Sequence, residues 1–491
     1  MTISASKLSL LTVIACLALA GCVTDWAQPE LDIVTPRAFK TEKAPAAPVV
    51  RGDWAKSFGS AELSALVAQA QRDNLDIAAA VGRIQQADAQ ARIQSAGLYP
   101  IINGTADAQR NQTPGTLRTK GGGPFFTSVN NTFSFGANAS YQVDFFGRYR
   151  DLSEAGRLLA DANRFDRDTI ALTTTAAVAN DYLQVLGAQD RLAIARENIR
   201  IAERVLDAIK SRVAAGTATA LDEAQQASVL AQQRANVPVL EQIAEQTKIT
   251  LAVLLGRTPE SVRIRGGSLD KVTAPAIRPG LPSQLLLRRP DVAAAEYNLA
   301  SEKFSVEAAR AQFFPQIALT GQSGLESIVL RNLLRPDALF FSFASQLTQP
   351  IFDGYNIQGQ FLQAQGRYKE LLEVYKKQIL TAFADVENAL IAVRQTTQRE
   401  RLQRLAVDAS RRAYQISEQR LREGTIDIVT LSTTEITLFQ TQDLLSQIRL
   451  ARMQSIVSLY QALGGGFAPD TLAFEVAQAK VAYEADKGLF P

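Results

Sequence analysis

The residue with the clearest chemistry is Cys22, which ends the motif Leu19-Ala20-Gly21-Cys22. Before it lies an apolar run with Lys7 as the only charge, and this run is shorter than the about 20 residues of a membrane-spanning helix. The arrangement is typical of a signal peptide, residues 1–21, that ends in a lipobox. We expect Cys22 to become the mature N-terminus and to carry acyl chains, palmitate among them. The alternative is an ordinary signal peptide with a chance cysteine.

The residue after Cys22 bears on the destination of the lipoprotein. Lipoprotein sorting in many Gram-negative bacteria retains proteins that have Asp directly after the lipid-bearing Cys. Here Val23 occupies that position and Asp25 comes later, so we expect delivery to the outer membrane, with outer-membrane lipid as the anchor's partner. Cys16 lies in the segment that would be removed.

The remaining composition excludes several kinds of catalytic site. The chain has no His and only two Cys, so the mature part cannot form a zinc site of His and Cys ligands, a thiol nucleophile or a Ser-His-Asp relay. An envelope glycosidase would need two converging acids, and no acid pair stands apart from helix-surface charge. The net charge of +3 is small and indicates no nucleic-acid partner. We expect no enzyme and no cofactor.

The chain contains an internal repeat of about 210 residues, which is a duplicated half-molecule rather than a solenoid repeat. The offset between matching residues is a few residues smaller in the later part of the two copies than in the earlier part. We therefore place an insertion in the first copy at Gly121-Gly122-Gly123-Pro124. We therefore expect an extended strap at 22–56 and repeats at 57–280 and 281–491. The matching segments are Asp76-Ile77-Ala78-Ala79-Ala80 with Asp291-Val292-Ala293-Ala294-Ala295, Leu98-Tyr99-Pro100 with Phe313-Phe314-Pro315, Gly216-Thr217 with Gly424-Thr425, and Leu255-Gly256 with Leu463-Gly464.

Each repeat contains two segments in which apolar and polar residues alternate. The clearest runs from Phe133 to Val143, and strict period two is the pattern of a strand. Strands of about 10 residues with one apolar face are typical of a membrane barrel, although a soluble hairpin gives the same pattern. Four strands cannot close a barrel, since the smallest have about 8, and open edges are not tolerated in lipid. We therefore expect three chains to pool their strands. The expected strands are about 100–112, 130–146, 315–326 and 339–352.

Long helices with few breakers follow each pair of strands. Apolar residues from Leu192 to Val213 alternate three- and four-residue spacings, which is the pattern of a coiled-coil seam. A dimeric coiled coil or a helical bundle is the plain alternative, and it does not account for the preceding strands. The chain from Gly464 to Pro491 is expected to pack as an equatorial segment around the helices. The expected helices are about 60–98, 151–213, 219–255, 289–313, 358–421 and 429–463.

Two motifs carry a resemblance to a known family. The segment from Leu281-Pro282-Ser283 to Arg288-Arg289-Pro290-Asp291, followed by Phe313-Phe314-Pro315, resembles the TolC family of outer-membrane efflux proteins. The chain looks closest to the NodT-type lipoproteins that serve RND pumps. The arginine motif itself has a structural interpretation, because Pro290 suits a first helical turn and Asp291 suits the helix dipole. The sequence names no partner for the arginines.

The resemblance implies a mainly α protein with membrane β-strands and an internally duplicated TolC-like fold. It implies a homotrimer with a twelve-stranded outer-membrane β-barrel continuous with a twelve-helix periplasmic α-barrel. It also implies a passive exit duct for small molecules, coupled through a periplasmic adaptor protein to an inner-membrane pump of the RND type. The alternatives are the outer-membrane duct of a type I secretion system and a periplasmic coiled-coil adaptor or scaffold lipoprotein.

The ends of the two helical hairpins hold the candidate adaptor contacts. Gly216 and Gly424 each follow a long helix, as a glycine in the left-handed conformation does at a helix C-terminus. Thr219 and Asp427 are natural N-caps for the return helices. By the resemblance these tips abut the adaptor. The contact candidates are Val213, Gly216, Thr217, Leu421, Gly424 and Thr425.

The resemblance also implies an acidic constriction at this end of the tunnel. The acid expected beyond the first glycine is present as Asp222, whereas Thr430 and Thr433 replace the two acids usual beyond the second, with Glu435 further in. Our hypothesis is that Asp222, repeated around the axis of the trimer, forms the constriction and is latched by an arginine. The gate candidates are Asp222, Glu223, Asp427, Arg212 and Arg420.

Overall fold

The computed structural model describes residues 29, 32, 36, 39–40, 53–113, 128–275 and 282–466. Cys22 and the signal peptide, most of the strap, the glycine-rich insertion and the C-terminal equatorial segment beyond 466 lie outside these residues. The contacts divide the chain into two compact units, and each takes segments from both repeats. Unit 1 contains Ile84–Ala162 and Glu296–Val374; unit 2 contains the described parts of Asp32–Arg83, Asn163–Ala295 and 375–466.

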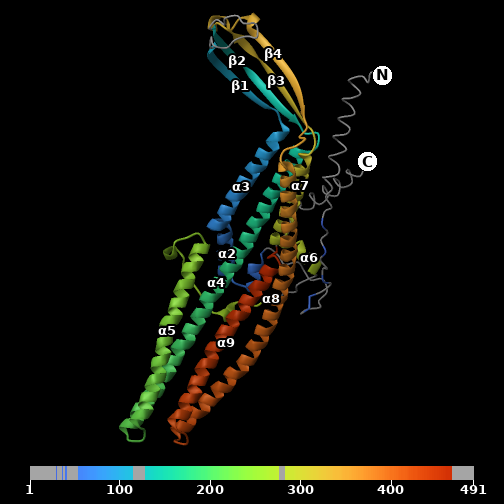
Figure 1. The fold of residues 1–491 in the computed structure, drawn as a ribbon. Helices are drawn as coiled ribbons and strands as arrows, with labels where there is room; N and C mark the ends of the chain where they lie inside the picture. The colour runs from blue at the N-terminus through green and yellow to red at the C-terminus, as the bar shows by residue number, and fades with distance from the viewer. Residues whose placement is uncertain are drawn as a thin grey trace. The chain divides into compact units, whose positions relative to one another are not determined.

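Unit 1 contains a four-stranded antiparallel sheet in the order β1-β2-β3-β4 (Figure 1). The register places Ala106 opposite Phe135, and Leu325 lies opposite both Phe135 and Leu339. One face of the sheet is therefore apolar across all four strands, as the alternation predicts. Phe135 and Leu339 on this face are exposed in the single chain. The strands are β1 (Ile101–Thr113), β2 (Ser128–Val143), β3 (Gln316–Ser327) and β4 (Leu339–Thr348).

Two of the expected strands end earlier than the sequence pattern indicates. The expected strand 130–146 ends at Val143, because the Asp144 carboxylate accepts from the backbone N–H of Tyr149 at 3.1 Å and of Arg150 at 2.9 Å and so begins the next helix. The expected strand 339–352 ends at Thr348, two residues before Pro350, which has no N–H to donate to a ladder.

Small residues allow the helices of unit 1 to pack closely. A Cβ at Gly156 would lie 3.1 Å from the Cα of Ala91. The Ser301 hydroxyl donates to the Ala155 carbonyl at 2.8 Å. The rings of Phe146 and Phe314, which follow β2 and precede β3, stack with centroids 4.7 Å apart.

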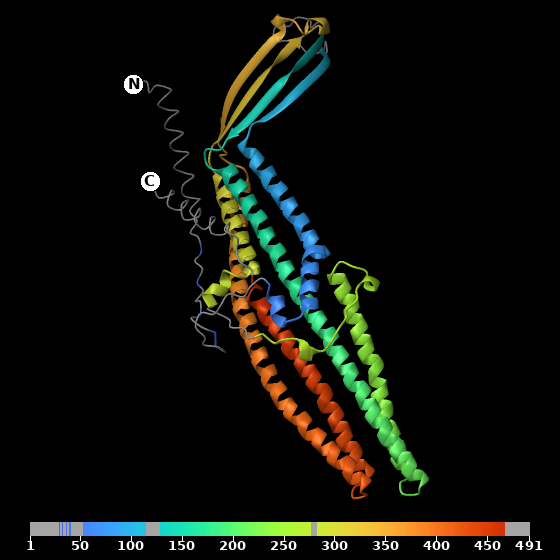
Figure 2. The ribbon, with the colours of Figure 1, turned by 180° about the vertical axis from the view of Figure 1, so that it is seen from behind.

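Unit 2 contains most of two helical hairpins, one from each repeat (Figures 1 and 2). The hairpins match in length, because α4 and α8 each have 67 residues and α5 and α9 each have 35. Among the described helices, none combines the length and the apolar character needed to cross a membrane. The α-helices are α2 (Ala61–Asp73), α3 (Leu75–Ser95), α4 (Arg148–Ala214), α5 (Ala220–Leu254), α6 (Pro282–Leu286), α7 (Pro290–Ala311), α8 (Asn356–Arg422) and α9 (Ile428–Ala462).

The hairpins pack onto a central core that includes the short helix before α2. Trp54 stacks on Tyr460 of α9 with ring centroids 5.0 Å apart, and Phe58 and Leu63 are fully buried beside them. The 3₁₀ helices are η1 (Trp54–Phe58), η2 (Ala96–Leu98), η3 (Pro259–Ser261), η4 (Leu269–Lys271), η5 (Leu330–Asn332) and η6 (Pro336–Ala338).

The expected single helix 60–98 is wrong, because the chain forms α2, α3 and η2 instead. Asn74 breaks it: its side-chain oxygen accepts from the backbone N–H of Asp76 at 2.9 Å and of Ile77 at 3.0 Å. Asn is a preferred N-cap for this reason, and the cap begins α3. The other expected helices end within a few residues of the observed bounds.

The repeat appears in the structure as a duplicated joint where α5 and α9 end. A Cβ at Gly256 would lie 2.2 Å from the carbonyl oxygen of Asp73, and one at Gly464 would lie 2.0 Å from that of Arg288. Both glycines have positive φ, 65° and 85°. The backbone therefore comes so close at these two matching positions that only glycine fits.

Candidate gate and docking surface at the hairpin tips

The two hairpins turn through the same backbone geometry. Gly216 and Gly424 have φ of 70° and 72°. Their N–H groups donate to the carbonyls of Val213 at 2.9 Å and Leu421 at 3.0 Å. The next residues repeat the pattern, because the N–H groups of Thr217 and Thr425 donate to the carbonyls of Arg212 at 2.8 Å and Arg420 at 3.0 Å. The predicted helix-terminal glycines are therefore present at both tips.

The N-caps of the two return helices use the same pair of residue types in opposite order: Thr then Asp in α5, and Asp then Thr in α9. At the start of α5, the Thr219 hydroxyl accepts from the Asp222 N–H, and the Asp222 carboxylate accepts from the Thr219 N–H at 2.7 Å. At the start of α9, the Asp427 carboxylate accepts from the Thr430 N–H at 2.8 Å. The hydrogen bond from Thr430 lowers the pKa of Asp427. Thr430 occupies the position that Asp222 has in the first repeat. In the second repeat the acid is Asp427, three residues earlier, which is the N-cap of α9.

The two tips lie together in unit 2 (Figures 1 and 2). The Arg212 guanidinium at the end of α4 donates to the Leu421 carbonyl at the end of α8, at 3.0 Å. An apolar cluster joins the hairpins behind this contact; it contains Val205, Ile209, Tyr414, Ile428, Leu431 and Leu438. Each tip is therefore held by the hairpin of the other repeat.

The candidate adaptor contacts fall into two groups. Gly216, Thr217, Gly424 and Thr425 are exposed. Val213 and Leu421 are half-buried, because they pack against the apolar cluster between the hairpins. The exposed group is available to another protein, whereas the half-buried pair already holds the two hairpins together.

The hypothesis places the contacts between the candidate gate residues in the assembled trimer, and a single chain shows the position of each residue. Asp222 and Glu223 are half-buried, while Asp427 and Arg420 are exposed. Within one chain the Asp222 carboxylate is engaged by Thr219, and Arg212 contacts a carbonyl. An arginine latch on Asp222 therefore stays a prediction about the assembled protein.

A buried polar cluster near the tips was missed by the sequence analysis. Gln226 of α5 and Glu435 of α9 are both 0% exposed. The Gln226 amide nitrogen donates to Glu435 Oε2 at 3.0 Å, and the Ser432 hydroxyl donates to Gln226 Oε1 at 3.2 Å. Glu435 Oε1 is buried and has no partner among the described residues. The cluster links the two repeats through polar groups inside an apolar interface.

The surroundings of Glu435 favour its neutral form. Burial raises the pKa of Glu435 to about 7, the hydrogen bond from Gln226 opposes this shift, and the charge of Glu418 on α8 adds to it. Burial likewise raises the pKa of Tyr414 on α8. A neutral carboxyl is therefore accessible in this interface near pH 7.

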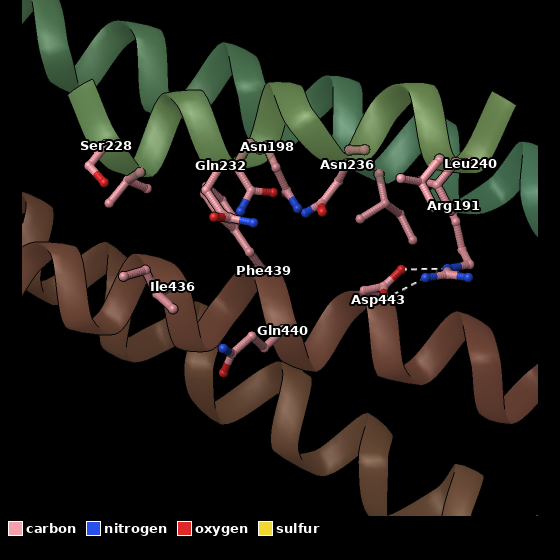
Figure 3. Close-up of a pocket in the computed structure, with 15 residues that line it drawn as sticks. Arg191, Asn198, Ser228, Gln232, Asn236, Leu240, Ile436, Phe439, Gln440 and Asp443 are labelled. Atoms are coloured by element: carbon pink, nitrogen blue, oxygen red, sulfur yellow. Dashed lines mark hydrogen bonds and ion pairs between the residues drawn. The ribbon is translucent and has the colours of Figure 1, made fainter. Parts of the chain in front are cut away.

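A cavity of about 520 Å³ lies next to this cluster, between α4, α5 and α9. Figure 3 shows Asn198 and Asn236 on the α4–α5 side and Phe439 on α9. At one end Arg191 donates to both carboxylate oxygens of Asp443, at 2.6 and 3.1 Å. Asn198 is 3% exposed and its Oδ1 accepts no hydrogen bond from the described residues. The two hairpins thus meet at polar contacts on either side of this cavity, at the Arg191–Asp443 ion pair and at the Gln226–Glu435 cluster.

Comparison with known proteins places this fold among channels. Over 91% of this chain and 100% of the other, the structure matches the outer-membrane channel OprN with a TM-score of 0.85 and 26% sequence identity. The open state of the MtrE outer membrane channel of Neisseria gonorrhoeae matches with a TM-score of 0.80 and 26% identity, over 91% and 98% of the two chains. The duplicated, mainly helical fold with a small sheet is that of TolC-family channels.

The sequence comparisons agree with the structural ones. The family model described as "Outer membrane efflux protein" matches residues 66–257 and 281–465. The pyoverdine export outer membrane protein OpmQ of Pseudomonas aeruginosa is 37% identical over 95% of this chain and 98% of its own length. The cation efflux system protein CusC of Escherichia coli is 30% identical over 94% and 100%. The chain belongs to the outer membrane efflux protein family.

These findings settle the class of function and the compartment. The protein is an outer-membrane channel component of an efflux system, with a long periplasmic helical part. The family and the relatives are channels rather than enzymes. They support efflux and give no support to a secretion duct or a coiled-coil adaptor.

Proposed function

We propose that three copies of this chain form a passive exit duct through the outer membrane. The observation that carries the proposal is the open sheet, whose edge strands β1 and β4 have no strand beyond them in the described chain. Its apolar face is exposed, and lipid does not tolerate unpaired backbone groups at a sheet edge. Twelve strands, four from each chain, would satisfy both edges in a closed barrel. The exposed apolar face would then meet lipid.

Two helices of unit 2, α8 and α5, each carry a stripe of exposed apolar side chains. On α8, exposed apolar side chains recur along one face, since a helix turns by about 100° per residue and five of them fall within an arc of about 60°. On α5 a second set of exposed apolar side chains is present. The α8 stripe is Leu380, Ile391, Leu402, Leu405 and Ile416, which are 45–62% exposed; the α5 stripe is Leu221, Val239, Ile249 and Val253, which are 49–65% exposed.

Two unlike stripes on one chain support a head-to-tail contact that closes into a ring. We assign the α8 stripe of one chain to the α5 stripe of the next. Burial of these side chains would contribute about 25 cal/mol per Å² of apolar surface. A dimeric coiled coil would instead pair like surfaces.

The tips and the N-terminus supply the remaining contacts of this proposal. The exposed residues Gly216, Thr217, Gly424 and Thr425 would meet a periplasmic adaptor, which links the duct to an inner-membrane pump of the RND type. Asp222 from three chains would form the acidic constriction. Acylation of Cys22 would anchor the duct in outer-membrane lipid; a relative of Salmonella typhimurium, 28% identical, is a probable outer membrane lipoprotein.

The proposed cargo is a small molecule selected upstream of the duct. Relatives with the same family fold carry names that refer to pyoverdine export and to cation efflux. A relay for soft cations would require accessible Met thioethers. The one Met after Met1 is Met453, which is buried in the core beside Ile456. A Met-based relay for soft cations is therefore not part of this proposal.

The test combines native mass and planar-bilayer conductance of the purified full chain. We expect a trimeric mass and stable conducting steps. Leu405→Glu places a charge in the α8 stripe and is expected to reduce the trimer fraction by at least tenfold. Arg411→Glu, an exposed change on another face of α8, is the control and should leave the trimer intact. A monomeric, non-conducting wild type would refute the proposal.

A further inference from the structure

The buried cluster of Gln226, Ser432 and Glu435 is placed where the two hairpins of one chain meet. Gln226 belongs to α5 and the other two belong to α9, so the hydrogen bonds cross from one repeat to the other. The Gln226 amide also lies 3.5 Å from the Ala202 carbonyl of α4. Separation of the hairpins at this level would break these bonds.

We propose that this cluster is a proton-operated latch, in which neutral Glu435 holds the hairpins of each chain together and ionised Glu435 releases them. The inference rests on the proposed function, because a latch of this kind regulates the duct whose tips it joins. It assigns regulation to a residue other than the candidate gate acids.

The chemistry of the cluster explains why the proton matters. Glu435 Oε2 already accepts from Gln226, whereas buried Oε1 has no partner. An ionised carboxylate would leave charge on an oxygen without a donor in an apolar interface, which is unfavourable. A protonated Oε1 carries no such charge. The hairpin contact therefore favours the neutral form.

Groups on the surrounding helices strengthen this preference. Glu418 on α8 repels an ionised Glu435, and both charges act on the buried Tyr414 of α8. The positive charges of Arg204 on α4 and Arg422 on α8 act on Tyr414 as well, and they lower its pKa. Among the described residues the donor that contacts Glu435 directly is the neutral Gln226.

The cavity beside the cluster offers space for water in the released state. Ile436, which directly follows Glu435 in α9, lines it together with Phe439, and Ser228 and Val229 line it just after Gln226 in α5. An ionised Glu435 that moves toward this space gains hydration at once. The same movement opens the contact between α5 and α9.

The direction of the pH effect follows from the pKa of Glu435, which is about 7 in the packed state and near its ordinary 4.5 when hydrated. Stabilisation of the closed contact is complete below the ordinary value and is lost as the pH rises through about 7. The two pKa values permit a change of up to about 300-fold in the open-to-closed ratio.

The decisive variant is Glu435→Gln, which keeps the shape and the hydrogen-bonding groups without a titratable proton. In planar bilayers between pH 5 and 8.5, we expect the open probability of the wild type to rise at least tenfold. The E435Q channel should stay at the low value throughout. Glu197→Gln, an exposed site on α4, is the matched control and should follow the wild type. An unchanged pH response in E435Q would overturn the latch.

A second variant and a second readout keep the test independent of conductance. Glu418→Gln removes the repelling charge and should move the midpoint to lower pH. Hydrogen exchange of residues 428–440 in the full chain, corrected for the intrinsic pH dependence, should accelerate at least tenfold from pH 5 to 8 in the wild type and not in E435Q. If no variant conducts but exchange follows this pattern, the duct proposal fails and the latch stands. Equal exchange in both proteins overturns the latch.

Discussion

The two repeats build the same joint with different electrostatics. In the first repeat, the neutral Asn74 side chain donates to the Leu254 carbonyl at the end of α5, at 2.9 Å. In the second, the Arg289 guanidinium donates to the matching Ala462 carbonyl of α9, at 3.4 Å, and forms ion pairs with Asp291 and Asp385. The backbone geometry is shared, but among the contacts of the described residues the second joint also binds α7 to α8.

The charged joint is compensated in detail. Arg289 is 8% exposed, and its two carboxylate partners balance the cost of burying the guanidinium. Burial alone would raise the pKa of Asp291, but hydrogen bonds from Arg289 and Gln378 lower it. The comparison shows that the two repeats share the positions of the glycine and of the carbonyl groups at the joint. The side chains at the joint differ, and in the second repeat they also connect α7 to α8.

The shared part of the comparison is tested by the two joint glycines. Gly464→Ala and Gly256→Ala force a Cβ against a carbonyl oxygen at 2.0 and 2.2 Å, at positive φ. We expect each to reduce the free energy of unfolding by more than about 3 kcal/mol, through steric strain at a special backbone position. Gly216→Ala is the control, because its φ of 70° is similar but nothing lies within 4 Å. It should cost about 1–2 kcal/mol in denaturant unfolding. Equal effects at the three sites would contradict the close approach.

The electrostatic part is tested by Arg289→Met against Asn74→Ala. Removing Arg289 leaves Asp291 without its buried partner, so we expect a loss of about 3–5 kcal/mol. Asn74→Ala removes a cap and should cost about 1–2 kcal/mol. Because the pKa of Asp291 is lowered, its contribution is present above the ordinary 3.8 and is lost as the pH falls through the folded value. Acid unfolding should therefore depend less on this carboxylate in R289M. A larger loss for N74A would reverse the comparison.

The smallest effects on stability are expected at the exchanged caps. Asp222→Asn and Asp427→Asn should each cost no more than about 1 kcal/mol, because the amide still accepts a hydrogen bond. Channel selectivity should separate them: Asp222→Asn is expected to lower the cation-to-anion permeability ratio about twofold or more, by loss of charge at the constriction. Bilayer reversal potentials measure this ratio. If Asp222→Asn changes neither conductance nor selectivity, the acidic constriction is not at Asp222.

Much of the fold could be predicted from local pattern. The alternation from Phe133 to Val143 defines β2, and the glycines at 216 and 424 define the hairpin turns, because each signal lies within a few residues. The break at Asn74 was missed although the sequence Asn74-Leu75-Asp76 contains an N-cap signal. The apolar periodicity continues across it and concealed the cap.

The polar contacts between the repeats could not be predicted. Glu435 and Gln226 have the spacing of ordinary helix-surface residues, and their burial arises only when α5 meets α9. The partners of Arg289 were unnamed for the same reason, since Asp385 lies on another helix far along the chain. Burial and pairing between distant segments are tertiary properties that no local pattern records.

A return helix that pivots at its glycine joint is a lever. α9 has 35 residues between its glycine joint and its tip, about 50 Å of helix. A rotation of only about 5° at the joint would move the tip by about 4 Å over this length. Glu435 lies close to the moving end, about 40 Å from the joint. The hydrogen-bonded cluster at Glu435 therefore acts far from the pivot. A modest change in its strength can control a large displacement of the tip.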